Sequence, residues 1–209
     1  MTKLLYVLCE GESEKVFVDS LLTPYLTSKF DIYVVTIILG GTTSYSSLVQ
    51  KTKRIVSELH NFVVTSMIDF YGLKGKPALH SSLPERMASE LEEHYLNDVG
   101  YEIFVPYFSM HEYEAIYFSD PHVFSFYSVS DVKEAEKILG KFHGNPEAIN
   151  GNESTAPSKR IQSFEPNYVK MSHAEELLKR LSLASISEKC HHFSSWIAIL
   201  EQCIEKDGG

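Results

Sequence analysis

Cysteine is scarce in this sequence. There are three, Cys9, Cys190 and Cys203, an odd number of residues that lie far apart in the chain. This spacing gives neither a disulfide framework nor a paired-cysteine metal motif. We therefore expect buried free thiols.

Long apolar runs are also missing. No stretch of about 18 consecutive apolar residues occurs, which excludes a conventional membrane-spanning helix. The first residues, Met1-Thr2-Lys3, lead straight into a predicted strand, without the apolar region and cleavage site of a signal peptide. We therefore expect a cytoplasmic protein that does not enter a membrane.

Cations are in the minority, with 19 Lys and Arg against 28 Asp and Glu and a formal net charge of −9. This balance argues against a surface that grips nucleic acid nonspecifically, because such a surface needs clustered cations facing the phosphates. It does not exclude a metal-dependent enzyme. An acidic cluster that binds Mg²⁺ adds to the negative count, and the bound ions would invert the local field.

The first half of the chain alternates between strand and helix patterns. Runs of apolar and β-branched residues predict strands over residues 4–9, 32–39, 62–69 and 101–108. Apolar residues at helical spacing predict helices over residues 15–26, 48–59 and 82–96. Such alternation implies right-handed crossovers and a mainly parallel sheet of about four strands flanked by helices, an α/β fold.

Three local features refine this expectation. Pro24, with the polar residues 27–29, marks a junction after the first helix. The uniformly apolar run at 32–39 indicates a strand buried on both faces, and Pro106 indicates that the fourth strand is an edge strand or ends there. The glycine pair at 40–41, followed by hydroxyl residues, is either a phosphate cradle or an ordinary turn with an N-cap; it lacks the Walker lysine.

The second half is less regular. Capping-box patterns predict three helices, over residues 132–139, 173–181 and 186–204. Between the first two, residues 141–170 are rich in Asn, Gly, Pro and Ser and are expected to be irregular. We expect a single domain over residues 1–209, with its core over about 3–130 and the irregular loop and C-terminal helices over about 131–206.

Carboxylates follow two of the predicted strands. Glu10 ends the first strand, Glu14 lies one helical turn further on, and Asp69 ends the third. Because the carboxyl ends of parallel strands share one edge of the sheet, where ligand sites form, Glu10 and Asp69 should lie together. Carboxylates of this kind suit Mg²⁺ or Mn²⁺, and the bound ions can activate water and stabilise the oxygens of a phosphodiester.

Each acid also has a structural alternative. Glu12 and Glu14 are favourable at a helix N-terminus, where negative charge offsets the macrodipole. Glu10 is harder to explain in this way, because it ends a buried strand, where an unpaired charge is costly.

A second acidic stretch follows the fourth strand. Glu112 fits a capping box with Ser109, whereas Glu114 is free of that role. His111 lacks the HExxH spacing of a zinc site, so we interpret it as a polar residue at a helix start.

Two pairs of cations could accompany these acids. Lys159 and Arg160 stand in an otherwise uncharged loop, as a solvated pair or as contacts that stabilise a phosphate or a leaving oxygen. Lys74 and Lys76, just after Asp69, could serve in the same way.

Several of these motifs resemble known ones. Residues 9–14, Cys-Glu-Gly-Glu-Ser-Glu, resemble the V-E-G-x-T-E signature of Toprim-type domains, and residues 67–72 resemble their D-x-D strand end. From Lys3 to about Lys170 the chain resembles the uncharacterised DUF4276 family of Toprim-like bacterial proteins. The hallmarks are Glu10-Gly11, Asp69-Phe70-Tyr71-Gly72, His111-Glu112-Tyr113-Glu114-Ala115 and Ser158-Lys159-Arg160.

The resemblance implies a compact Toprim-like, Rossmann-like sheet with a metal-dependent phosphodiester site that uses Mg²⁺ or Mn²⁺. It also implies a role beside an ATPase in defence against phages or mobile elements. If the roles of the matching family residues apply here, Glu10 would bind metal or relay a proton, and Asp69 would bind metal. Lys159 would contact a phosphate or the transition state.

One departure from the Toprim pattern matters. Tyr71 stands where the second aspartate of D-x-D would be. Either Glu14, Glu112 or Glu114 replaces that ligand, or the metal chemistry is weakened or lost.

Two functions follow from this sequence. The first is a metal-dependent nuclease that hydrolyses nucleic-acid phosphodiesters. The alternative is a catalytically degenerate binding or regulatory module, which docks on an ATPase or senses a nucleotide without hydrolysis.

Overall fold

A parallel sheet forms the centre of the computed structural model, which describes residues 2–40, 44–59, 62–149 and 155–206. Its strands are β1 (Lys3–Cys9), β2 (Ile32–Ile38), β3 (Val63–Asp69), β4 (Phe104–Val105) and β5 (Phe108–Ser109). The strand order is β2-β1-β3-β4, and β5 pairs with the end of β3 beyond β4. Every pairing is parallel. The α/β architecture predicted from the sequence is confirmed.

The middle strands are the most deeply buried part of the sheet. Leu5 of β1 pairs with Val34 of β2 on one side and with Val63 of β3 on the other. In β3 every residue except the last, Asp69, is buried. Such β-branched and aliphatic residues are typical of a strand covered on both faces.

Pro106 splits the predicted fourth strand into β4 and β5. Proline has no backbone N–H to donate, so the ladder is interrupted there. Pairing with β3 resumes beyond it, since Ile68 N donates to Tyr107 O at 3.2 Å. The short β5 therefore extends the carboxyl edge of the sheet next to Asp69.

The expectation that β2 is buried on both faces was wrong. β2 is an edge strand that pairs only with β1 in the described structure. Most of its residues are half-buried, and Tyr33 is 64% exposed. An apolar run alone did not distinguish the edge from the centre of the sheet, because both kinds of strand use β-branched residues.

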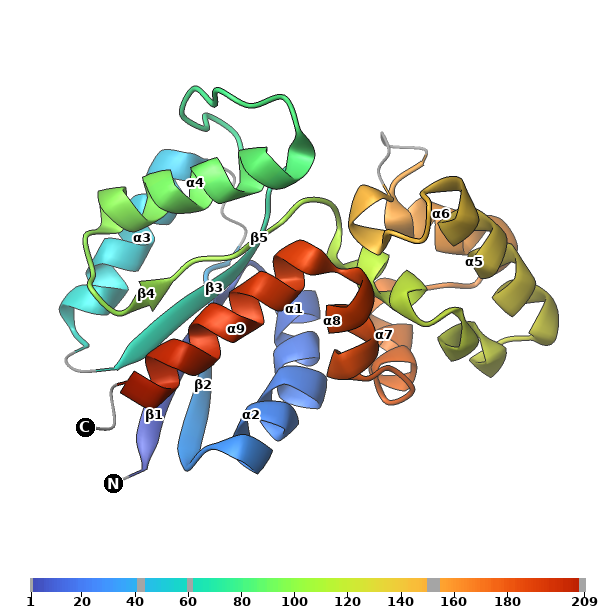
Figure 1. Ribbon diagram of the computed structural model, residues 1–209, viewed down its shortest axis with the longest axis horizontal. Helices are drawn as coiled ribbons and strands as arrows, with labels where there is room; N and C mark the ends of the chain where they lie inside the picture. Colours follow the sequence, from blue (N-terminus) through green and yellow to red (C-terminus); the bar gives the residue numbers. More distant parts are fainter. Residues whose placement is uncertain (1, 41–43, 60–61, 150–154, 207–209) are drawn as a thin grey trace.

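Helices cover both faces of the sheet (Figure 1). On one face α3 (Tyr45–Ser57) and α4 (Pro84–Val99) pack on Leu8, Val64 and Ile68. On the other, α1 (Glu12–Phe17) and α9 (His191–Lys206) pack on Leu5, Val7 and Met67. Alternate residues of each strand thus enter two separate hydrophobic cores.

The predicted junction at Pro24 was wrong. Helical structure continues from α1 through the π-helical turn η1 (Val18–Leu22) into α2 (Thr23–Lys29). In the π turn the N–H of Thr23 reaches back to Val18 O. Pro24 then occupies the first turn of α2, where helices tolerate the loss of an N–H.

At the start of α3, Ser44 acts as an N-cap and accepts a hydrogen bond from Ser47 N. This observation fits the ordinary-turn interpretation of the glycine pair. The remainder of that stretch, residues 41–43, lies outside the described residues.

Helices dominate the rest of the chain. They are η2 (Tyr113–Ser119), η3 (Pro121–Phe126), α5 (Val129–Lys141), η4 (Pro146–Ala148), α6 (Pro157–Phe164), α7 (Lys170–Leu178) and α8 (Leu183–Lys189). The short helix α6 lies within the stretch predicted to be irregular. One hydrophobic cluster runs without a break from the sheet into these helices.

All three predicted helix starts in this half were displaced, since α7 also begins earlier, at Lys170 and not at residue 173. Helix α5 is capped by Ser128 and α8 by Ser182, each three residues before the residue predicted from the capping-box pattern. The helix predicted over 186–204 is divided at Cys190, whose backbone is extended and separates α8 from α9. Serine-rich stretches offer several N-caps, so the pattern alone did not choose the right one.

The last helix, α9, returns to the sheet. Trp196 Nε1 donates to Thr65 Oγ1 of β3 at 2.8 Å, and the Trp196 ring stacks on Tyr107 with centroids 4.4 Å apart. Near its end, Lys3 Nζ donates to Ile204 O, which places the start of β1 beside the end of α9 (Figure 1).

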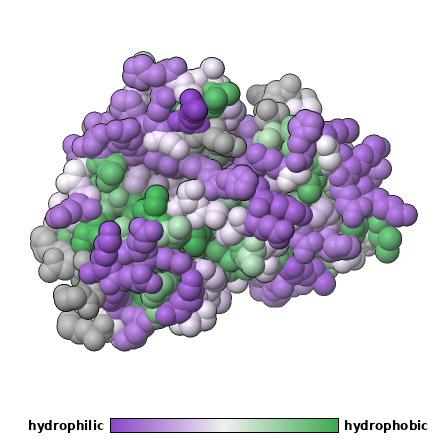
Figure 2. Space-filling model, viewed as in Figure 1, coloured by the Kyte–Doolittle hydropathy of each residue, from purple (hydrophilic) through white to green (hydrophobic). Residues whose placement is uncertain are grey.

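The surface agrees with the composition. Hydrophilic residues cover most of the face seen in Figure 2, and hydrophobic ones show mainly in a band between α4 and α9. In the part of the chain that is described, no helix has both the length and the apolar character needed to cross a membrane. The three cysteines are free thiols, with Cys9 and Cys190 buried and Cys203 half-buried.

Candidate functional site

The first and third strands end at two acids that touch. Glu10 directly follows β1, and its Oε2 accepts a hydrogen bond from Asp69 N, the last residue of β3, at 3.1 Å. Parallel pairing of β1 with β3 sets this register, because Cys9 lies opposite Met67. The structure thus brings together the two strand-end acids that the sequence predicted to be neighbours.

Asp69 shapes the turn that follows β3. Its Oδ1 accepts from Tyr71 N at 2.9 Å and from Gly72 N at 3.3 Å, which makes an Asx-type turn of the sequence Asp-Phe-Tyr-Gly. Among the described residues, no donor reaches Asp69 Oδ2 or Glu10 Oε1. Each acid therefore keeps one oxygen for another ligand.

Both acids have raised pKa values. Burial raises the pKa of Glu10 most, the hydrogen bond from Asp69 N opposes this, and the charges of Asp69 and Glu14 raise it further. Burial also raises the pKa of Asp69, against the hydrogen bonds from Gly72 and Tyr71. Each carboxylate is thus poorly solvated, as in many functional sites that bind a cation.

A second pair of acids meets a lysine from a distant helix. Lys170 Nζ lies 2.9 Å from Glu114 Oε1 and 3.5 Å from Glu112 Oε1. Glu114 is wholly buried and neither of its oxygens has a well-aligned hydrogen-bond donor among the described residues, so the ion pair is its main compensation. Burial raises the pKa of Glu114 to about 7, against the effect of Lys170.

Glu112 joins this pair to helix α6. Its Oε2 accepts from Ser158 N at 2.9 Å, at the N-terminus of that helix, where a negative charge is favourable. Burial would raise the pKa of Glu112, but the hydrogen bonds from Ser158 and the charge of Lys170 lower it. The capping box predicted with Ser109 was wrong, since Ser109 Oγ donates to His111 O instead.

Lys170 is the residue on which the acids converge. Burial would lower its pKa, but the charges of Glu114, Glu112 and Glu14 raise it. Its charge also acts on Glu10 and Asp69. Sequence analysis gave Lys170 no role, although it begins α7, where a cation faces the positive end of the macrodipole and needs a partner. That position was the available signal, and it was missed because α7 was expected to begin three residues later.

Glu14 has a local structural role. Its Oε2 accepts from Gly11 N at 3.0 Å, which caps the first turn of α1. Ser13 Oγ also donates to this carboxylate, at 3.3 Å. Glu12 is exposed, and it has no hydrogen bond to the other acids among the described residues. Of the three acids after β1, Glu10 is the one held against the second strand end.

The predicted cations lie elsewhere. Lys159 is exposed, and its Nζ donates to Gln162 on the same helix at 3.0 Å. Arg160 lies over the ring of Phe142, with 5.0 Å from Cζ to the ring centroid. A role of either residue with a phosphate stays a prediction.

The lysines after Asp69 differ from each other. Lys74 is exposed, and its backbone bridges to Ser44. Lys76 is half-buried and donates to Phe70 O at 2.9 Å. Burial lowers the pKa of Lys76, and the charge of Asp69 opposes this.

The donor set suits a divalent cation of the magnesium type. Within the described ranges, no group of three or more His, Cys, Asp or Glu side chains is arranged to hold a metal ion. Mg²⁺ needs fewer protein ligands, because it keeps several waters and is usually held by one or two carboxylates with substrate phosphates. Glu10 and Asp69, each with one oxygen to spare, fit that kind of site.

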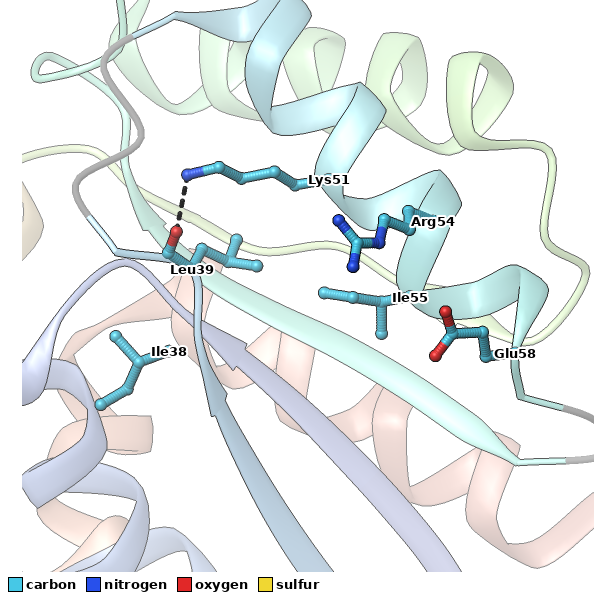
Figure 3. A pocket seen from close by; sticks show the side chains of 6 residues that line it. All are labelled: Ile38, Leu39, Lys51, Arg54, Ile55 and Glu58. Carbon is cyan, nitrogen blue, oxygen red and sulfur yellow. Dashed lines mark hydrogen bonds between the residues drawn. The ribbon is translucent and has the colours of Figure 1, made fainter.

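A separate hollow on the surface is lined by none of the acids or lysines of this site. It lies between β2 and α3, measures about 250 Å³, and is lined by Ile38, Leu39, Lys51, Arg54, Ile55 and Glu58 (Figure 3). Lys51 Nζ closes one end of it by donating to Leu39 O at 2.7 Å. This hollow and the acids are thus separate features of the molecule.

Comparisons with known proteins place this arrangement in a family. A search among curated proteins gave no match. One solved structure, the C-terminal region of the OLD protein of Xanthomonas campestris pv. campestris, is similar with a TM-score of 0.40 and 14% identity, over 93% of this chain and 96% of that one. The family model described as a domain of unknown function, DUF4276, matches residues 9–201, which include every acid of the site. The chain therefore belongs to the DUF4276 family.

Proposed function

We propose that the carboxyl edge of the sheet is the active site of a Toprim-like, metal-dependent hydrolase of nucleic-acid phosphodiesters. The Glu10–Asp69 pair carries this proposal. Two poorly solvated carboxylates lie at the ends of adjacent parallel strands, the carboxylate of Glu10 accepts a hydrogen bond from the backbone N–H of Asp69, and each carboxylate keeps one free oxygen. Sites for ligands in α/β sheets form at this edge.

Glu10 and Asp69 would hold the ion, Mg²⁺ or Mn²⁺, which when bound activates water and stabilises the charge on the phosphodiester oxygens. The pKa values of both acids, raised mainly by burial, favour this role, because a bound cation would stabilise poorly solvated negative charge. Glu14 holds the first turn of α1 in place and so positions Glu10 beside it.

Lys170 supplies a fixed positive charge at the same edge. Its ammonium group, held by Glu112 and Glu114, can neutralise a phosphate oxygen as charge develops. The two glutamates act through Lys170, so they are positioning residues. Glu114 is too deeply buried to reach a substrate itself.

The contacts between separate motifs support a shared site. Residues 10–11 and 69–72 meet through Glu10 and Asp69, and residues 111–115 and 158–160 meet through Glu112 and Ser158. Lys170 links the two halves electrostatically. A protein that used these acids only for capping would have no need to gather them around one cation.

The biological setting is proposed from the family resemblance alone. It implies an ATPase partner and a role in defence against phages or mobile elements. Lys159, Arg160 and Lys74 are exposed or near the surface and would contact the nucleic-acid backbone beyond the scissile phosphate.

Nicking of plasmid DNA and cleavage of RNA in Mg²⁺ or Mn²⁺ test the proposal. We expect cleavage by the wild type that is abolished by Glu10→Gln and by Asp69→Asn, and unchanged in Glu12→Gln. Glu12 is a matched control because it is an exposed glutamate two residues from Glu10. Cleavage by both variants at the wild-type rate would overturn the assignment.

A second candidate function rests on Lys170. Its ammonium already provides a cation among the acids, so the edge can be neutralised without metal, as in a binding module that docks on an ATPase or senses a nucleotide. Isothermal titration separates the two functions. Uptake of Mn²⁺ that is lost in Asp69→Asn favours the hydrolase, and its absence in the wild type favours the binding module.

A further inference from the structure

Tyr71 presents an exposed aromatic ring beside the acids. It stands two residues after Asp69, and its backbone N–H is bonded to that carboxylate at 2.9 Å. Its side chain is 55% exposed, in contrast to its neighbour Phe70, which is 1% exposed. This is also the position at which the chain departs from the D-x-D pattern.

The ring of Tyr71 is held in one orientation. It stacks on the ring of His111 with centroids 5.0 Å apart and an interplanar angle of 7°. Phe70 meets it nearly at right angles, with centroids 5.2 Å apart. His111 is itself buried, at 7% exposure, so the stack rests on a rigid base. One face of Tyr71 is therefore covered, and the exposed part of the ring faces solvent.

The charge of the protein makes such a ring useful. With a net charge of −9 and several acids at the site, the protein gains little affinity from phosphates, whose binding depends on clustered Lys and Arg. Stacking of a base on an aromatic ring does not depend on net charge, and it accepts any base because every base has a π face.

We propose that Tyr71 is a stacking platform for an unpaired base, so that the site takes single-stranded nucleic acid. The placing of the neighbouring phosphate at Glu10 and Asp69 rests on the proposed function, whereas the stacking does not. In a duplex the faces of the bases are covered by their neighbours, so a duplex cannot use this ring. Preorganisation by His111 reduces the entropy lost when a base binds.

Another exposed tyrosine provides a matched control. Tyr33 is 64% exposed but lies near the start of the edge strand β2, so it is at the opposite end of the sheet from Asp69. Any effect of tyrosine loss on general surface properties should be shared by both positions. An effect on base stacking should belong to Tyr71 alone.

Fluorescence anisotropy with a labelled oligothymidine measures the binding, in Ca²⁺ and in EDTA so that cleavage does not interfere. We expect the wild type to bind the single strand more tightly than the same sequence in a duplex. Tyr71→Ala should weaken single-strand binding about tenfold. Tyr71→Trp should retain the affinity, and Tyr33→Ala should leave it unchanged.

A second measurement needs no variant and so does not depend on the folding of Tyr71→Ala. Wild-type protein should bind an abasic oligonucleotide about tenfold more weakly than oligothymidine, because an abasic strand keeps the phosphates and lacks the bases. Equal binding of the two strands, or equal losses in Tyr71→Ala and Tyr33→Ala, would overturn the proposal. Binding that depends on Tyr71 without any cleavage would sustain the platform and count against the hydrolase alone.

Discussion

The ammonium group of Lys170 lies 2.9 Å from Oε1 of Glu114, a side chain that is wholly excluded from solvent. Fifty-six positions separate the two residues in the chain, so the contact depends on the packing of α7 against α1, η1 and η3. A buried carboxylate is costly without a partner. The contact therefore joins the stability of the helical half of the chain to the chemistry of the acidic edge.

Replacing Lys170 with methionine should destabilise the fold. Methionine keeps most of the packing volume but leaves Glu114 and Glu112 without their cation. Breaking a fully buried pair costs roughly 3–5 kcal/mol, but the Lys170 side chain is 40% exposed, so solvent reduces the expected loss to about 2 kcal/mol. Urea denaturation at pH 7 measures this loss.

Lys179→Met is the matched control for that experiment. Lys179 ends the same helix and pairs with Glu175 and Glu176, but its side chain is 55% exposed. Exposed pairs of this kind contribute little, so its removal should leave the free energy of unfolding essentially unchanged. Equal losses in the two variants would show that Lys170 has only a surface role.

The sheet and the meeting of Glu10 with Asp69 were predictable because both follow from local patterns. Alternating strands and helices imply parallel pairing, and parallel strands end at one edge. The sequence position of an acid at the end of a predicted strand is then enough to place it at that edge. The same logic placed Pro106 at a break in the sheet, since proline has no N–H to give.

The role of Lys170 was not predictable in this way. Its partners lie in η2 and at the N-cap of η2, and the chain between them and Lys170 includes η3, α5 and α6, whose packing the sequence pattern did not reveal. For a related reason, the sequence did not show which strand lies at the edge of the sheet. The residues of β2 have the same strand propensities as those of β3, and only the count of neighbouring strands distinguishes them.

His111 should make the protein sensitive to acid. Burial lowers the pKa of His111 from 6.5 to about 4, so the unfolded state binds a proton between these values and the folded state does not. Stability from this residue is therefore complete above pH 6.5 and falls as the pH approaches 4. The total loss is about 3 kcal/mol, since one pKa unit corresponds to about 1.4 kcal/mol.

The variant His111→Phe keeps an aromatic ring against Tyr71 and removes the titration. Relative to that of the wild type, its free energy of unfolding should rise by up to about 3 kcal/mol as the pH falls from 7 to 4, because only the wild type loses stability in acid. Urea denaturation across this range measures the difference. A difference that does not change with pH would mean that His111 titrates normally.

Thr65 of β3 makes one side-chain hydrogen bond to α9 and one to β4. Its Oγ1 accepts from Trp196 Nε1 at 2.8 Å and donates to Val105 O at 2.6 Å, in a site with no solvent exposure. Thr65→Val keeps the shape but leaves the indole N–H unsatisfied, which should cost about 1–3 kcal/mol. Thr27→Val, which removes an exposed hydroxyl bonded within α2, should cost less than about 0.5 kcal/mol.

Binding of a metal ion at Glu10 and Asp69 should stabilise the folded protein. An ion that binds only the folded state adds about 2.7 kcal/mol when its free concentration is a hundred times the dissociation constant. Titration with Mn²⁺ should therefore raise the melting temperature of the wild type and of Glu12→Gln. Asp69→Asn should abolish the rise, because an amide oxygen carries no charge to attract the ion.

Lys170→Met should increase the rise in melting temperature on addition of Mn²⁺, since removing a neighbouring positive charge leaves the acids more attractive to a cation. A weaker rise in Lys170→Met would instead mean that its ammonium group helps to assemble the metal site.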